Sequence, residues 1–272
     1  MLPRLIILIS LLAISGCATL PKHYVSLNTG ADLNFNEVLT EIESSKAIFV
    51  GELHATPRHH KVQLEVIKHL HNAGRKVAIA FEMLPATKQN ILDGWINGSI
   101  PESTFTRIYQ NYVNLPFRYY RNIFLFARDK GIPIVAINAD KKLIANVSRN
   151  GLGVVPDEVL GKTSFTGCSQ DPDYERFIGL SGNRDYHVSG MPYLCDAQRI
   201  RDAVMAYNVS KLMVYGNYTV VVLTGVLHAA KLAMPQMLKN YTTLPYKVLM
   251  PHKVGHIVSS RPDINIADYL WY

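Results

Sequence analysis

Apolar runs of strand length alternate with stretches of helical periodicity along most of the chain. The runs typical of buried strands cover residues 47–50, 77–81, 132–137, 218–223 and 247–250. Helices are predicted between them, over residues 56–73, 87–97, 117–130, 197–214 and 231–239. Thr56 and Pro57 have the form of a cap and first-turn pair, and Gly74 stops the helix that they open.

This order of elements predicts an α/β domain with a mostly parallel sheet and helices on both faces, because parallel neighbours need crossover connections. Two small helical or loop inserts interrupt the alternation. Residues 98–116 break the period with Gly, Pro and Asn, which places one insert near 98–120, and the other lies near 155–195. We expect a single domain over residues 17–272.

The N-terminus has the pattern of an export signal. A short positive start ending at Arg4 precedes a mainly apolar run of ten residues, which is too short to cross a bilayer. The tetrad ISGC that follows resembles a bacterial lipobox, which implies removal of residues 1–16 and acylation of Cys17. Ala18 then favours the outer membrane of a bacterial cell envelope. The alternative is an ordinary secretory signal with an incidental cysteine.

Composition narrows the class further. The chain is 48% hydrophobic and 18% charged, which supports a sizeable core, and its net charge of +7 favours an anionic membrane surface or ligand. A nucleic-acid partner is not expected, because no run of five or more Lys or Arg occurs.

In an exported protein Cys168 and Cys195 are expected to form a disulfide, the alternative being two buried thiols.

Polar residues follow three of the predicted strands. Glu52 and His54 come after the first, two residues apart and so on one face of extended chain; Glu82 ends the second, and His228 follows a later one. Ligands of α/β sheets bind at this edge, and such a set suits a divalent metal with an activated water. Alternatively, both carboxylates accept backbone or Arg hydrogen bonds and both imidazoles are buried and neutral.

Two further observations concern histidines outside this set and enzyme motifs that the sequence lacks. His59 and His60 fall in the first turn of a predicted helix, where we expect solvated or capping side chains. The chain has no GxSxG, GxxxxGK[ST] or strand-linked GxGxxG motif, which argues against serine hydrolases, P-loop NTPases and dinucleotide-binding enzymes.

Five segments in order resemble the ChaN family of haem-binding lipoproteins, within a superfamily that includes Tiki metalloproteases and erythromycin-esterase-like proteins. They are VGELHATPRHHKVQLEVIKHL, AIAFEMLP, RNIFLFARDKGIPIVAIN, DAQRIRDAVMA and TGVLHAAK. The superfamily's shared positions fall on Glu52, His54, Glu82 and His228. One departure is GVLH at residues 225–228, where many relatives have GNGH.

The resemblance implies a homodimer of iron or haem uptake that holds haem at the subunit interface, with a tyrosine on iron and a histidine assisting from the partner. The segment between the cysteines offers apolar residues, cations and tyrosines. Tyr186 and His187 are the first candidates and Tyr174 the second, with Arg176 and Arg184 nearby; Tyr119 and Tyr120 are expected to pack within a helix.

The alternative function is a metal-dependent, Tiki-like hydrolase. It would use the strand-end residues Glu52, His54, Glu82 and His228, with one carboxylate as general base. The haem-binding hypothesis describes a non-catalytic protein instead.

Overall fold

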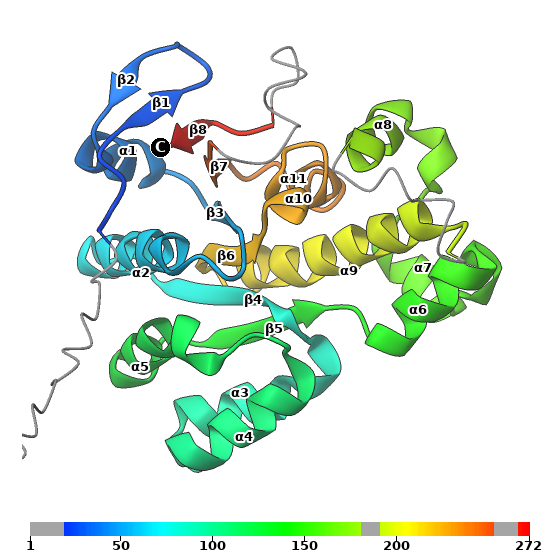
Figure 1. Ribbon diagram of the computed structural model, residues 1–272, viewed down its shortest axis with the longest axis horizontal. Helices are drawn as coiled ribbons and strands as arrows, with labels where there is room; N and C mark the ends of the chain where they lie inside the picture. The colour runs from blue at the N-terminus through cyan, green and yellow to red at the C-terminus, as the bar shows by residue number, and fades with distance from the viewer. Residues whose placement is uncertain (1–18, 181–190, 253–265) are drawn as a thin grey trace, which may run out of the picture.

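A largely parallel sheet forms the centre of the computed structural model, which describes residues 19–180, 191–252 and 266–272 (Figure 1). Within these ranges eight strands lie in the order β2-β1-β8-β7-β3-β6-β4-β5. The six from β8 to β5 are parallel, and β1 and β2 continue the sheet antiparallel at one edge. The strands are β1 (Tyr24–Ser26), β2 (Asp32–Leu33), β3 (Ala47–Glu52), β4 (Val77–Pro85), β5 (Ile134–Asn138), β6 (Thr219–Gly225), β7 (Tyr246–Pro251) and β8 (Tyr269–Trp271).

Helices cover both faces of this sheet, as the alternation predicts (Figure 1). The first half of the chain supplies α1 (Phe35–Ile42), α2 (Pro57–Asn72), η1 (Ala86–Lys88), α3 (Gln89–Ile96), α4 (Glu102–Tyr112), η2 (Phe117–Tyr119) and α5 (Arg121–Lys130). The second half supplies α6 (Lys141–Asn150), η3 (Leu152–Val154), α7 (Asp157–Thr163), η4 (Cys168–Gln170), α8 (Pro172–Leu180), α9 (Leu194–Val214), α10 (Val226–Ala229) and α11 (Met234–Leu238).

The central strands are apolar on both sides because each face of the sheet packs against a separate core. In β3, Ile48 and Val50 belong to the core beneath α1 to α5, whereas Ala47 and Phe49 belong to the core beneath α8 to α11. Successive side chains of a strand point to opposite faces, so a strand covered twice needs apolar residues throughout. The short strand-like runs in the sequence therefore mark the buried centre of the sheet.

The first predicted insert is more regular than its sequence indicates. Residues 98–116 contain α4, which begins after Pro101 and buries Phe105 and Tyr109. These two rings lie four residues apart and so share one helix face, where both pack near Phe124 and Phe105 also packs near Trp95. The Gly, Pro and Asn residues mark the ends of short helices here.

A disulfide joins Cys168 to Cys195, which confirms the predicted pair. It ties η4 to the first turn of α9 across 27 residues, with 5.9 Å between the two Cα atoms. Closing a loop of this length stabilises the fold by about 3 to 4 kcal/mol in the chain-entropy treatment. The disulfide thus ties the middle of the second insert to the end of the insert.

The lipobox and Cys17 lie outside the described residues. Within the described ranges, no helix combines the length and the apolar character that crossing a bilayer requires.

Candidate functional site

Four polar residues predicted from the sequence lie together at the carboxyl ends of the central strands. Glu52 ends β3, His54 follows it, Glu82 lies in β4 and His228 lies in α10 directly after β6. Both carboxylates are almost fully buried, with 1% and 4% of Glu52 and Glu82 exposed. Buried carboxylates need partners, and each has its own set.

Glu52 is held by residues from α2 and from the start of α5. His54 Nδ1 lies 2.6 Å from one carboxylate oxygen, which the Tyr120 hydroxyl also contacts as a donor. Gln63 Nε2 donates to the other oxygen over 2.6 Å, and His60 Nδ1 lies 3.3 Å from it. The predicted approach of His54 to Glu52 along extended chain is present, and three further partners surround it.

Glu82 is the hub of a second set. One carboxylate oxygen accepts hydrogen bonds from the Thr224 hydroxyl over 2.6 Å and from the Gly225 amide over 2.7 Å. The other accepts from Arg201 Nη2 over 2.9 Å and lies 3.6 Å from His228 Nε2. Glu82 therefore joins β4 to β6 and to α9.

A chain of buried groups extends from His228 into the helices. His228 Nδ1 lies 2.6 Å from one oxygen of Asp202, which is fully buried in α9. The Tyr174 hydroxyl donates to the other oxygen of Asp202 over 2.7 Å. The contact with Asp202 fixes the orientation of the His228 ring. As a result, the other ring nitrogen, Nε2, faces Glu82.

The two halves of the cluster meet above Gly225. A side chain at this position would begin 3.2 Å from the His54 ring and 3.7 Å from Glu82 Oε2. Glycine thus permits His54 to approach the end of β6 closely. The polar groups form one connected assembly across β3, β6 and β4.

Opposing effects set the pKa values of the two glutamates. Burial raises the pKa of Glu82, but the charges of His228, Arg201 and His54 outweigh it and lower the pKa to about 2. Burial likewise raises the pKa of Glu52, and its contacts with His54 and His60 lower it to about 2. Both carboxylates are therefore ionised at neutral pH.

The histidines beside Glu52 shift in the opposite direction. Burial lowers the pKa of His54, but the hydrogen bond to Glu52 and the charges of both glutamates raise it overall. For His60 the carboxylate of Glu52 again outweighs burial and raises the pKa. Both ring nitrogens of His60 face acceptors, since Nε2 lies 2.8 Å from the His54 carbonyl oxygen. This geometry suits an imidazolium.

The expectation that His59 and His60 are solvated or capping side chains is wrong. They are only 6% and 4% exposed. His60 turns inward to Glu52, and His59 Nδ1 accepts a hydrogen bond from the Leu53 amide over 2.9 Å. A first-turn position discourages charged histidine only weakly, and a buried carboxylate next to His60 overrides this effect.

The described residues give no support to a divalent metal. They contain no group of three or more His, Cys, Asp or Glu arranged to hold one. The oxygens of Glu52 and Glu82 already accept hydrogen bonds, and the Arg201 guanidinium occupies the position beside Glu82 that a cation would compete for.

The predicted haem residues divide into three groups. Arg184, Tyr186 and His187 lie outside the described residues. Arg176 is exposed on α8 and lies 3.9 Å from Asp173. Tyr174 is fully buried, and its hydroxyl is engaged with Asp202, so the structure argues against Tyr174 as an iron ligand.

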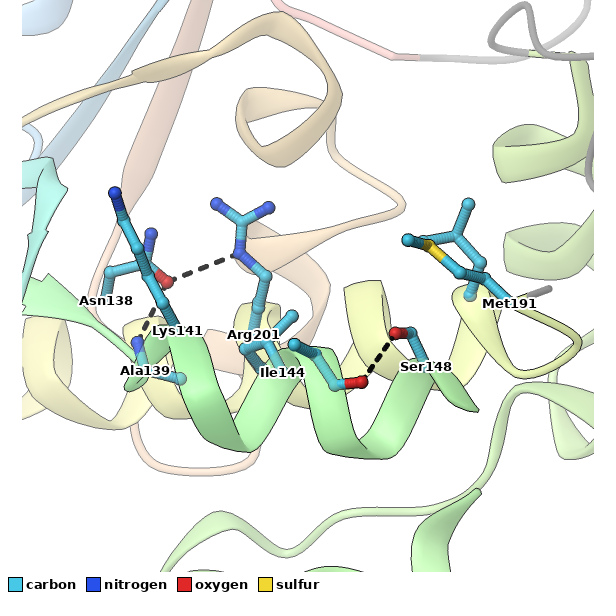
Figure 2. Close-up of a pocket in the computed structure, with 9 residues that line it drawn as sticks. Asn138, Ala139, Lys141, Ile144, Ser148, Met191 and Arg201 are labelled. Atoms are coloured by element: carbon cyan, nitrogen blue, oxygen red, sulfur yellow. Dashed lines mark hydrogen bonds between the residues drawn. The ribbon is translucent and has the colours of Figure 1, made fainter. Parts of the chain in front are cut away.

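A cavity of about 320 Å³ opens beside this cluster, between β5, α6 and α9 (Figure 2). Arg201 belongs to both, since it lines the cavity and donates to Glu82. Lys141 and Asn138 lie toward the same end as Arg201, and Met191 lies at the opposite end (Figure 2). The apolar part of the lining consists of Ala139, Ile144, Ala145, Met191 and Leu194.

Helical periodicity does not reveal which residues in or beside a helix reach the site. Tyr120 is buried, as the expected packing in a helix requires, but its hydroxyl also contacts Glu52. Arg201 and Asp202 sit within the long α9, where periodicity shows only which face is buried. Asp202 is fully buried in α9, and no motif in the sequence marks it as a site residue.

Comparisons with known proteins bear on the fold. A family model described as haem-binding uptake, Tiki superfamily, ChaN matches residues 38–238. The structure of ChaN of Campylobacter jejuni, described as binding haem cofacially, has a TM-score of 0.68 at 18% identity and covers 91% of this chain and 95% of that one. An erythromycin esterase variant, EreC in its open conformation, has a TM-score of 0.51 at 15% identity, with 84% and 76% covered. A comparison with curated proteins found no match.

We predict that the two buried carboxylates make the protein acid-sensitive. A carboxyl group whose pKa is lower in the folded protein than in the unfolded chain stabilises the fold. This contribution is fully present above the unfolded-state pKa near 4.5, and it is lost as the pH falls toward the folded-state pKa of about 2. Glu82→Gln should lower the free energy of unfolding at pH 7 by on the order of 3 kcal/mol. The difference from the natural protein should shrink between pH 4.5 and 2.5, as measured by urea unfolding.

Glu102→Gln is the matched control, because Glu102 pairs with Arg121 at the surface. Its effect on stability should be small at every pH. An unchanged difference between Glu82→Gln and the natural protein across this pH range would contradict the prediction.

Proposed function

The chain belongs to the haem-binding uptake family ChaN of the Tiki superfamily, and we propose that it is a haem-binding lipoprotein of iron or haem uptake whose haem occupies the cavity between β5, α6 and α9. The single observation that carries this assignment is the lining of that cavity. It combines apolar walls with two cations at one end.

The lining fits the chemistry of haem. The porphyrin plane is apolar and favours walls such as Ile144 and Leu194, whereas its propionates are anionic and favour Lys141 and Arg201. Arg201 is fixed at the cavity by its hydrogen bond to Glu82. We therefore propose that the polar cluster of Glu52, His54, Glu82 and His228 positions Arg201 at the cavity, and that Glu82 is the group that contacts Arg201 directly.

The iron ligand that we propose is Tyr186, and the adjacent His187 shares its place as first candidate. A phenolate suits ferric iron, and Arg184 two residues earlier would favour the ionised phenol. Met191 lines the cavity five residues after Tyr186, so the chain allows a separation of at most about 18 Å between them. The haem iron supplies redox chemistry and coordinates axial ligands when bound.

Dimerisation and anchoring complete the proposal. A porphyrin is larger than a cavity of about 320 Å³, so a single subunit would leave part of it exposed for a second subunit to cover. The lipobox ending at Cys17 supports attachment to the bacterial envelope, with Ala18 favouring the outer membrane.

The alternative of a metal-dependent hydrolase is not adopted. Its four residues lie together, but their carboxylates are occupied by Tyr120, Gln63, Thr224 and Arg201. Glu82 instead accepts a hydrogen bond from Arg201, and Arg201 also lines the cavity.

Ferric haem titrated into the purified protein should give a saturable, high-spin, tyrosinate-type absorption spectrum, with dimer formation in sedimentation velocity. Tyr186→Phe should abolish that spectrum, because the phenolate ligand is lost. Tyr215→Phe is the matched control, since Tyr215 is 85% exposed at the end of α9. If Tyr186→Phe with haem gave the same spectrum as the natural protein, Tyr186 would not be the iron ligand. If the natural protein showed no saturable haem binding, the proposed function would be refuted.

Neighbouring lysines test the cavity itself. Lys141→Gln should weaken haem binding roughly fivefold, as expected for one partly exposed ion pair to a propionate. Lys142→Gln should leave affinity unchanged, because Lys142 is also exposed but does not line the cavity. Equal effects of the two substitutions in the same absorbance titration would place haem elsewhere.

Anchoring is tested by Cys17→Ser in a Gram-negative host. The natural protein should fractionate with membranes and incorporate labelled palmitate, because acylation requires the thiol of Cys17. The serine variant should lose the label. Labelling that persists in Cys17→Ser would contradict a lipid anchor at this residue.

A further inference from the structure

A second cavity, of about 440 Å³, lies between the segment after α7, the helix α9 and the end of α11. Its described lining consists of Ser164, Thr166, Arg199, Gln236, Met237 and Asn240. None of these residues lines the proposed haem cavity, although α9 contributes Arg199 to the one and Arg201 to the other. We call this second space the polar cavity, because Met237 is the one apolar residue in its described lining.

Solvent reaches most of the polar side chains of this lining. Ser164, Thr166 and Asn240 are exposed, and Gln236 is half-buried. The described residues supply no hydrogen-bond partner to the side chains of Ser164 and Asn240. Gln236 is engaged there through its Nε2 nitrogen, which leaves its carbonyl oxygen available. A ligand in the cavity can therefore contact both amides and both hydroxyls.

A buried arginine fixes the lining in place. Arg199 is 5% exposed, and its Nε donates to the Thr166 carbonyl oxygen over 2.8 Å, while Nη2 donates to the Thr166 hydroxyl oxygen over 3.2 Å. Arg199 Nη1 donates to Asp171 over 2.9 Å, and Gln236 Nε2 donates to the same oxygen over 3.3 Å. Thr166 and Gln236 are thus oriented before a ligand arrives, which reduces the entropy that binding costs.

Ser164 has an unusual backbone conformation at this cavity. It ends α7 with φ 42° and ψ 43°, in the left-handed region that residues other than glycine seldom adopt. Among the described residues, Asn217 is the one other non-glycine residue with a positive φ. Backbone strain of this kind is concentrated at functional sites. Here it accompanies a turn after which both Ser164 and Thr166 line the cavity.

The lining does not select an anion or an aromatic ligand. Arg199 is the one charged residue of the described lining, and the Asp171 carboxylate pairs with its charge. An anion therefore gains little net attraction. The same lining contains no aromatic ring, so a flat aromatic ligand would find no surface on which to stack.

Amides and hydroxyls are the groups that remain, and both kinds donate as well as accept hydrogen bonds. Sites for drug-like ligands are mainly apolar, with volumes of about 300 to 1,000 Å³, so this cavity has the size of a ligand site but not its usual lining. The hydroxyl groups of a saccharide also donate and accept, and its C–H groups can lie against an apolar side chain such as Met237. The lining thus matches a saccharide group by group.

We propose that the polar cavity binds a neutral saccharide. The sugar hydroxyls exchange hydrogen bonds with the amides of Gln236 and Asn240 and with the hydroxyls of Ser164 and Thr166, and the carbon skeleton lies against Met237. Arg199 is a positioning residue that holds Thr166 from behind. This site does not depend on the proposed function, and it gives the protein a second ligand that binds without haem.

Side-chain amide signals in a ¹⁵N–¹H correlation spectrum of the purified protein test the proposal. The probes are methyl α-glucoside, methyl α-mannoside, methyl β-galactoside and N-acetylglucosamine, and at least one should move the Gln236 and Asn240 signals in a saturable way. The Gln89 signal should stay in place, because Gln89 donates to the Ile134 carbonyl oxygen over 2.9 Å and accepts from the Ala136 amide over 2.8 Å. Inorganic phosphate and 2-phenylethanol are the comparison probes.

Two variants with matched controls locate the sugar. Ser164→Gly should weaken binding about fivefold, because it removes one hydroxyl where the left-handed backbone suits glycine. Asn217→Gly makes the same exchange at the other positive φ, outside the described lining, and should leave affinity unchanged. Asn240→Ala should likewise weaken binding about fivefold, whereas Asn36→Ala, at an exposed position of α1, should not. An unchanged Gln89 signal reports that each variant is folded.

Three results would overturn the proposal. The first is an absence of saturable shifts of the Gln236 and Asn240 signals with all four sugars. The second is an equal response to phosphate or to 2-phenylethanol, which would indicate a site for anions or for apolar molecules. The third is an equal loss of affinity in Ser164→Gly and Asn217→Gly, which would place the sugar elsewhere. None of these results bears on haem binding, which the haem titration tests separately.

Discussion

Burial of two carboxylates at the ends of the two parallel strands that flank β6 is the constraint on which the rest of the structure depends. Glu52 and Glu82 lose their water on folding, and this loss is tolerable only if donors replace it. The donors come from segments far apart in the chain, including α2, the start of α5, β6 and α9. The hydrogen bonds that the glutamates accept therefore fix these elements at the carboxyl ends of the central strands.

The same constraint explains how a ligand cavity arises beside the cluster. Glu82 holds Arg201, and Arg201 brings a cation to the mouth of the space between β5, α6 and α9. Asp202, the next residue in α9, points its carboxylate to His228 and Tyr174. One helix thus serves the buried network and the cavity with consecutive residues, and the Cys168–Cys195 disulfide secures the start of that helix.

Sequence patterns identify much of this arrangement, for physical reasons that also set their limits. The central strands are recognisable because two covered faces demand unbroken apolar runs, and Glu52, His54, Glu82 and His228 follow from their places after those strands. The strands β1, β2 and β8, at one side of the sheet, are too short to show a period. The partners Tyr120, Arg201 and Asp202 lie in helices, where spacing reveals a buried face but not which distant residue it meets. The inward turn of His60 depends on Glu52 and could not be read from α2 alone.

The position of haem is the central claim, and a crystal structure of the haem complex tests it most directly. We expect the porphyrin between Ile144 and Leu194, with its propionates toward Lys141 and Arg201 and the Glu82–Arg201 contact retained. Haem bound on another surface, with this cavity empty, would contradict the claim even if the protein bound haem tightly.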